Sequence, residues 1–189
     1  MKDVLPGTTV ERDSLWGEEF LNGIFAPTGG IYMSQIREMT GLETPAVQNW
    51  VKRGWLERPV GRKYDKDRFA RILIINMLRG VMQLDDISFL LTYINGRADS
   101  RDDDIIPESV LYGYICSIYD MCDGCGEYDL SRLDEHIDEV IRGYRESIPG
   151  GKKRLKTALR IILTAYKAAK TKDVSDGMLS ELKSEKGVK

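Results

Sequence analysis

Apolar residues recur at helical spacing along most of the chain. The segment from Lys66 to Val81 is apolar on most of its faces, so we expect a helix at the centre of the fold that is buried on several sides. The segment from Leu84 to Ile94 has one apolar stripe and two aspartates in its first turn, as amphipathic helices often do. Helices are predicted over residues 13–25, 34–39, 45–52, 66–81, 84–94, 107–121, 130–147 and 152–170.

Two features interrupt this helical pattern. Residues 55–64 predict a small β-hairpin in which Pro59 and Gly61 supply the turn and aromatic residues flank it. Residues 172–189 are polar, and we expect them to form a flexible tail. The expected fold class is therefore all-α with a small β-hairpin wing, and no internal repeat is visible.

The two short predicted helices at 34–39 and 45–52 are typical of a helix-turn-helix. Gly41 permits the sharp turn between them, Thr44 is expected to cap the second helix, and Pro45 suits its first position. The expected small core of this motif consists of Ile36, Met39, Leu42 and Val47.

The polar residues of the second helix and of the hairpin are of the types that contact DNA. Glutamine and asparagine pair bidentately with adenine, whereas lysine and arginine suit guanine or phosphate. A cationic hairpin tip is typical of a wing that contacts phosphates or the minor groove. The candidate DNA-binding residues are Thr44, Ala46, Gln48, Asn49, Lys52 and Arg53 in the helix and Arg58, Arg62 and Lys63 in the hairpin. Trp50, Trp55 and Tyr64 are expected to pack inside the motif instead.

Short motifs within about residues 31–94 resemble a known DNA-binding family. They are Ser34-Gln35-Ile36, Met39-Thr40-Gly41-Leu42, Thr44-Pro45, Val47, Gly54-Trp55-Leu56, Arg62-Lys63-Tyr64-Asp65, Ala70-Arg71-Ile72, Gln83-Leu84-Asp85-Asp86-Ile87 and Leu90-Leu91. Together they resemble the winged helix-turn-helix of MerR-type transcription regulators, which implies a DNA-binding regulator. MerR-type proteins carry an Arg-Tyr-Tyr set where this chain has Gln48-Asn49-Trp50, so the resemblance implies no base preference. Their dimers use a long coiled coil after the DNA-binding part, whereas here the helix ends near Gly96, so a dimer must form differently.

A second set of motifs reaches to about residue 125. It comprises Gln48-Asn49-Trp50-Val51-Lys52-Arg53-Gly54, the run from Ala70 to Leu78, Tyr93-Ile94-Asn95-Gly96 and Asp103-Asp104-Ile105-Ile106. This set is similar to an uncharacterised bacterial family known only as a domain of unknown function. The similarity supports the fold more than it supports any cellular role.

The net charge of −2 conceals a segregation of sign along the chain. Residues 31–83 carry +5, residues 84–150 carry −11, and residues 151–189 carry +7. A basic helix-turn-helix region is consistent with a polyanionic partner. The basic residues of the helix at 152–170 either form a second phosphate contact or neutralise the acidic helices before them, and we favour neutralisation.

Other candidate chemistry is weaker. Cys116, Cys122 and Cys125 have a spacing compatible with zinc or redox chemistry, but the sole histidine, His136, lies 11 residues further on in another predicted helix. We therefore favour an inert loop at a helix end over a metal or redox sensor. The aspartates at 102–104 lack the spacing of a calcium loop. Because no phosphate-cradling glycine loop or catalytic triad is present, we expect neither an enzyme nor a cofactor.

These observations predict four regions. They are an N-terminal helical extension (1–30), a winged helix-turn-helix (31–96), a C-terminal helical region (97–171) and a flexible tail (172–189). No apolar run is long enough for a membrane helix and no export core is present, so we expect a cytoplasmic protein.

The expected function is sequence-specific binding of double-stranded DNA by a homodimeric bacterial transcription regulator. Exposed residues such as Phe89 and Tyr93, or the C-terminal helices, are candidates for the dimer interface. The alternative is a protein–protein interaction module that retains the fold without specific DNA binding. A small-molecule or protein effector at the C-terminal helices is compatible with the first function, although the sequence indicates no ligand.

Overall fold

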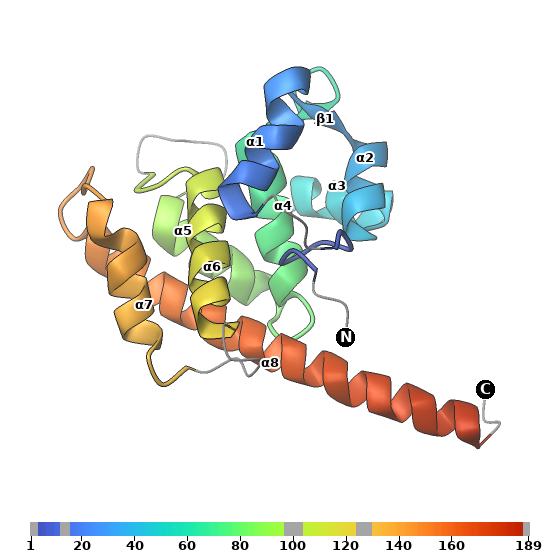
Figure 1. Ribbon diagram of the computed structural model, residues 1–189. Coiled ribbons are helices and arrows are strands. Elements are labelled where there is room, and N and C mark those ends of the chain that lie inside the picture. The colour runs from blue at the N-terminus through green and yellow to red at the C-terminus, as the bar shows by residue number, and fades with distance from the viewer. Residues whose placement is uncertain (1–3, 12–15, 97–103, 124–129, 187–189) are drawn as a thin grey trace.

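The computed structural model describes residues 4–11, 16–96, 104–123 and 130–186, and it is mostly helical with one small antiparallel sheet. Figure 1 shows the helices packed into one body, from which the end of the last helix projects. The elements are α1 (Gly17–Thr28), β1 (Ile31–Tyr32), α2 (Met33–Thr40), α3 (Thr44–Lys52), β2 (Lys63–Tyr64), α4 (Lys66–Leu78), α5 (Leu84–Asn95), α6 (Glu108–Asp123), α7 (Leu133–Val140), the 3-10 helix η1 (Ile141–Gly143) and α8 (Gly151–Glu185). The expectation of an all-α protein with a small β element is confirmed at this level.

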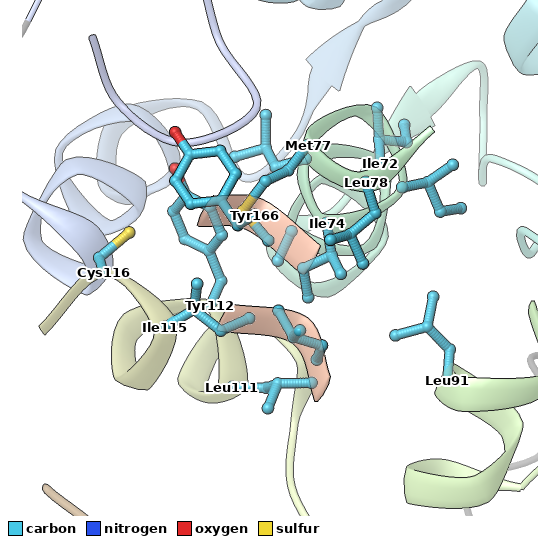
Figure 2. Packing of buried hydrophobic residues seen from close by; sticks show 14 of the residues in the cluster. Ile72, Ile74, Met77, Leu78, Leu91, Leu111, Tyr112, Ile115, Cys116 and Tyr166 are labelled. Carbon is cyan, nitrogen blue, oxygen red and sulfur yellow. The ribbon is translucent and has the colours of Figure 1, made fainter. Parts of the chain in front are cut away.

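Helix α4 is the centre of the fold, as its apolar pattern predicts. Asp65 caps its first turn, because a carboxylate oxygen accepts the backbone N–H of Arg68 at 2.9 Å. The helix packs against α1, α2, α5, α6 and α8 and is buried around its whole circumference. Figure 2 shows side chains of α4, α5, α6 and α8 gathered in this common core, among them Ile74, Leu91 and Tyr112. Helix α4 therefore packs against helices from both the N-terminal and the C-terminal halves of the molecule.

The small sheet differs from the predicted hairpin. Strand β2 pairs with β1, with Ile31 opposite Tyr64, rather than with residues 55–59. The local hairpin is reduced to a two-residue turn in which Val60 and Lys63 exchange both backbone hydrogen bonds, at 3.0 and 2.9 Å.

The central residues of this turn both have a left-handed backbone. Gly61 has φ +56° and Arg62 has φ +66°, which is the backbone of a type I′ turn. The sequence indicated Pro59 and Gly61 as the turn residues, but the structure places Gly61 and Arg62 at its centre. We call residues 60–63 the cationic turn.

Helix α8 is much longer than expected. Residues 172–189 were expected to form a flexible tail, but the helix continues to Glu185, and every residue from Thr171 to Lys186 is exposed. This stretch contains no proline and many strong helix formers, and Lys172 bonds Asp176 one turn later at 2.5 Å. At 1.5 Å per residue, the helix is about 50 Å long.

Two other helices have different limits from those predicted. Helix α1 begins at Gly17 and passes through Pro27 to Thr28, rather than ending at Phe25. The expected caps of this helix, at residues 13 and 14, lie outside the described residues. The predicted helix over 130–147 is reduced to α7 and η1, because the chain leaves helical geometry at Tyr144.

The N-terminal segment, residues 4–11, is fastened to the central helices. The hydroxyl of Tyr112 in α6 donates a hydrogen bond to the Pro6 carbonyl at 2.8 Å, and Asn76 in α4 donates to the Gly7 carbonyl at 2.9 Å. At Gly7 the backbone φ is +76°, and a Cβ atom would lie 2.2 Å from the Leu73 carbonyl oxygen. Only glycine fits this close approach of the segment to α4.

Stability is expected to fall at alkaline pH. Burial raises the pKa of the Tyr112 hydroxyl well above its ordinary value, and burial also raises the pKa of Tyr64. Above about pH 10, tyrosines of the unfolded chain ionise while these two stay protonated in the native state, so the free energy of unfolding decreases as pH rises. Urea titrations at pH 8 and at pH 10.5 measure this decrease.

The matched variant is Tyr112→Phe. At pH 8 it is expected to lower the free energy of unfolding by about 1–3 kcal/mol, because the buried Pro6 carbonyl loses its donor. Between pH 8 and pH 10.5 it is expected to lose less stability than the wild type does. An equal loss in both proteins would contradict the role given to this hydroxyl.

Candidate nucleic-acid interface

The candidate interface begins with two short helices joined by a tight turn. Gly41 ends α2 in the left-handed conformation at φ +67°, and its N–H bonds the Arg37 carbonyl at 2.8 Å. The Thr40 hydroxyl donates to the Ile36 carbonyl at 2.6 Å and accepts the Leu42 N–H at 3.2 Å, so the backbone of the turn is satisfied locally. This geometry fixes the direction in which α3 leaves the turn.

The start of α3 differs by one residue from the prediction. Thr44 is already the first helical residue, and Glu43 stands at the cap position without a side-chain hydrogen bond. The expectation that Thr44 caps the helix is therefore wrong, although Pro45 lies in the first turn as expected. The N-terminal N–H groups of α3 receive no capping side chain from Glu43.

The inner surface of the α2–α3 pair is apolar, as predicted. Ile36, Val47 and Leu42 are at most 1% exposed, and Met39 is half-buried. Trp50 is 2% exposed and belongs to this core, which confirms that it packs rather than faces outward. Because Val47 and Trp50 point inward, the positions between them on α3 face away from the core.

The outward positions of α3 carry the candidate polar residues. Gln48 and Lys52 are one turn apart, as are Asn49 and Arg53, and all four side chains are exposed. Thr44 and Ala46 are half-buried, so they contribute less surface. The structure therefore brings together amide and cationic groups in two adjacent rows on α3 and its C-terminal cap residue, Arg53.

The C-terminal end of α3 is closed by a glycine motif. Gly54 has φ +75° and bonds the Val51 carbonyl at 3.1 Å, and the Trp55 N–H bonds the Trp50 carbonyl at 3.0 Å. The guanidinium of Arg53 lies 5.0 Å from the centre of the half-buried Trp55 ring. This stacking holds the Arg53 side chain at the end of α3.

The cationic turn and its neighbour Arg58 provide the second group of charges. Arg58 and Arg62 are exposed, whereas Lys63 is half-buried with its ammonium group 5.2 Å from the Tyr32 ring. Tyr64 is 5% exposed and packs in the core, as expected. Lys63 is thus held against β1, and Arg58 and Arg62 extend into solvent.

Helix α4 fastens the segment that joins α3 to the cationic turn. Arg71 donates from Nε to the Trp55 carbonyl at 2.7 Å, and Arg68 forms an ion pair with Glu57 at 2.5 Å and another with Asp65. These contacts were not predicted. The signal was present, because a charged residue in a run as apolar as that around Arg71 needs a buried partner.

The side of the α2–α3 turn is mixed in charge. A shallow groove is lined by Ser34, Arg37, Glu38, Gly41, Leu42 and Glu43. Arg37 lies 3.6 Å from Glu43, so its charge is partly compensated on this side. The groove is therefore a poorer anion site than the outward face of α3.

The structure describes only part of the remaining candidate chemistry. Cys116 and Cys122 are buried in α6, and Cys125 lies outside the described residues. Among the described residues, no three histidine, cysteine, aspartate or glutamate side chains gather as a metal site would require. His136 is half-buried on α7, and of the three aspartates at 102–104 only Asp104 is described.

The basic residues of α8 neutralise the acidic helix before it, as we expected. Lys156 pairs with Asp138 of α7 and Arg160 with Asp134, each at 2.6 Å. Arg154 donates to the Tyr93 and Ile94 carbonyls at the end of α5, at 2.8 and 2.7 Å.

In the part of the chain that the structure describes, none of the helices combines the length and the hydropathy needed to cross a bilayer.

Two comparisons with known proteins found similarities, and the family model covers this interface. An aligned region of 86 residues is 28% identical to "Uncharacterized protein YkrK" of Bacillus subtilis (strain 168), and it covers 43% of this chain and 37% of that protein. The chain thus matches well under two thirds of this relative's length, and the search of solved structures found no match. Residues 26–115, from the end of α1 to the middle of α6, match the family model described as "Domain of unknown function (DUF1836)".

Proposed function

We propose that α2, α3 and the cationic turn form a winged helix-turn-helix that binds double-stranded DNA sequence-specifically, as a transcription regulator of bacteria. The observation that carries this proposal is the outward face of α3, where Gln48, Asn49, Lys52 and Arg53 are exposed on a helix whose inner face is locked into the core. A helix of this kind fits the major groove, and its amide groups match the edge of adenine.

The cationic turn acts as the wing in this proposal. Arg58 and Arg62 extend into solvent and would contact phosphates, each contact contributing a term that weakens as salt rises. Lys63 is held against Tyr32 and supports the turn from the side of β1. Thr44 and Ala46 lie beside the reading face and take part through their partly exposed atoms.

The protein binds DNA as a homodimer in this proposal, because one helix-turn-helix module buries only about 600–1,000 Å² of surface. The candidate interface is the exposed end of α8. Val174, Met178 and Leu182 are spaced by four residues and are 42%, 66% and 50% exposed. Leu179, at 49%, widens this stripe. An isolated helical end of this length is marginally stable in water, so a partner that covers the stripe would also stabilise the helix.

The spacing of the stripe favours a second copy of the same chain as that partner. Val174 and Leu182 lie four residues before and after Met178 on α8. In an antiparallel pair with Met178 opposite Met178 of the other copy, each Val174 faces a Leu182, so the two stripes cover each other. This arrangement differs from a coiled coil placed directly after the DNA-binding part, since α8 follows three further helices.

A second candidate function rests on Phe89. This side chain is 72% exposed on α5, one turn after Asp85 and Asp86, whose side chains are also exposed. Aromatic side chains are enriched at protein interfaces, and the two carboxylates would attract a partner with basic groups. The chain would then be an interaction module that retains the fold without specific DNA binding.

The test of the DNA-binding function is in vitro selection of fragmented genomic DNA at physiological salt. The variant Gln48→Ala with Arg62→Ala is run beside the wild type. The wild type is expected to enrich one palindromic motif, and the variant is expected to lose it, because a base contact contributes about 1–3 kcal/mol and a phosphate contact adds to that. Alanine and arginine both carry a Cβ atom, so the backbone strain at position 62 is the same in the variant.

The matched control replaces Gln83 and Arg142, which are exposed on other elements, by alanine. This variant is expected to enrich the same motif as the wild type. Recovery of DNA without a motif, unchanged by the substitutions at positions 48 and 62, would contradict the proposal. That result would favour the interaction module with a protein partner.

A further inference from the structure

The most deeply placed charge near the candidate interface is Arg71. It lies in α4 between Ala70 and Ile72, both at 0% exposure, and is itself 4% exposed. A guanidinium group in such surroundings must be paired and hydrogen-bonded to be tolerated. The hydrogen-bond partners of Arg71 therefore show which parts of the molecule this side chain connects.

Arg71 links the two halves of the chain. Its Nη1 donates to Glu108 Oε1 at 2.8 Å, and its Nε donates to the Trp55 carbonyl at 2.7 Å. Glu108 is the first residue of α6 and is 8% exposed. Asp67, one turn earlier in α4, accepts the Ser109 N–H at 3.0 Å, so the start of α6 is fixed to α4 at two points.

Both the backbone N–H and the backbone carbonyl of Trp55 are hydrogen-bonded, and its ring is also in contact. Its N–H bonds the Trp50 carbonyl in α3, its carbonyl accepts from Arg71, and its ring lies beneath the Arg53 guanidinium. A continuous series of contacts thus runs from Glu108 through Arg71 and Trp55 to Arg53. The series starts at the C-terminal helices and ends at the exposed tip of α3.

We propose that Glu108 is a positioning residue for the DNA-binding face, which acts through Arg71 and Trp55 to set the position of Arg53 and the end of α3. This inference rests on the function proposed above. The carboxylate of Glu108 holds the Arg71 guanidinium in the orientation that presents Nε to the Trp55 carbonyl. Loss of the Glu108 carboxylate therefore lowers DNA affinity, although α6 itself contributes none of the candidate DNA contacts.

The substitution that tests this role is Glu108→Gln. It keeps the length of the side chain and an oxygen acceptor but removes the charge that orients Arg71. The matched control is Glu135→Gln, which removes a carboxylate from an exposed ion pair with Arg132 at 2.8 Å. A second variant, Arg71→Lys, keeps a positive charge beside Glu108 but lacks the planar fork that reaches both Glu108 and Trp55.

Two measurements are made on the full chain. The first compares amide and indole resonances by NMR, where Glu108→Gln and Arg71→Lys are expected to shift Gly54, Trp55 and Arg53 and to leave Gly61 and Arg62 unchanged. The second measures the dissociation constant for a DNA fragment selected by the wild type. An affinity loss of about tenfold is expected for both variants, with a salt slope smaller by about 0.9 because one phosphate contact is lost. Glu135→Gln is expected to match the wild type in both.

The outcomes separate this inference from the function on which it rests. Unchanged resonances at Trp55 and Arg53 in the variants would overturn the positioning role. So would an unchanged affinity of the variants for a fragment that the wild type binds. If the wild type selects no DNA, the proposed function fails, and the NMR comparison alone then decides whether Glu108 positions Arg53. A melting temperature above the assay temperature in each variant ensures that the readouts report on folded protein.

Discussion

Replacing Trp50 by alanine is expected to lower the free energy of unfolding by about 3–5 kcal/mol. Trp50 is 2% exposed and fills the space between α3 and the rest of the α2–α3 core. The substitution removes its buried surface and leaves a cavity that the short helices close only in part. Urea unfolding monitored by circular dichroism measures the change. An equal dependence of the free energy of unfolding on urea concentration in the wild type and the variant shows that the two-state comparison holds.

Two variants accompany Trp50→Ala. Trp50→Phe retains most of the buried volume and is expected to lose less than half as much stability. Gln48→Ala, two residues away on the exposed face, is expected to change the free energy of unfolding by no more than about 0.5 kcal/mol. If Trp50→Ala were as mild as Gln48→Ala, α3 would not be anchored as the structure shows.

Placing two charges in the apolar stripe of α8 is expected to prevent formation of the proposed dimer. Met178→Glu with Leu182→Glu puts four carboxylates into the two-copy interface, where each would lose its hydration. Sedimentation equilibrium at micromolar concentration measures the mass of the particle. The selected palindromic motif is expected to be bound at least 100-fold more weakly by the variant, because each copy then reads one half-site alone.

The control for this pair is Ser180→Glu, which adds a charge on the opposite side of α8. It is expected to leave both the mass and the affinity unchanged. A wild-type protein that stays monomeric over the whole concentration range would contradict the proposed interface. So would a charged variant that still sediments as a dimer.

The sequence was sufficient to predict the elements that depend on local periodicity. Helix α4 and its cap at Asp65 follow from an apolar pattern on all faces and a carboxylate at the start. The inner face of the α2–α3 pair follows from the spacing of Ile36, Leu42 and Val47. In each case the determining residues are neighbours along the chain, so their spacing carries the information.

Elements that depend on distant pairing or on weak packing were missed or misplaced. The pairing of β1 with β2 joins residues more than thirty positions apart, so no local pattern indicates it. The polar end of α8 has a composition compatible with either a tail or an exposed helix, and its helix formers decide the outcome. The Arg71–Glu108 pair joins residues 37 positions apart, and only the buried charge itself pointed to it.

The central place of α4 also bears on how this protein can be recombined with others. A segment cut after Gly96 would carry the α2–α3 pair but would bare the side of α4 that Leu111, Tyr112 and Ile115 cover, and it would strip Arg71 of its carboxylate. The region that matches the DUF1836 model ends at residue 115, so it includes Glu108, Leu111, Tyr112 and Ile115. The smallest part of the chain that can be transferred to another protein therefore includes the first half of α6. A shorter graft would leave one side of α4 uncovered and Arg71 without its carboxylate partner.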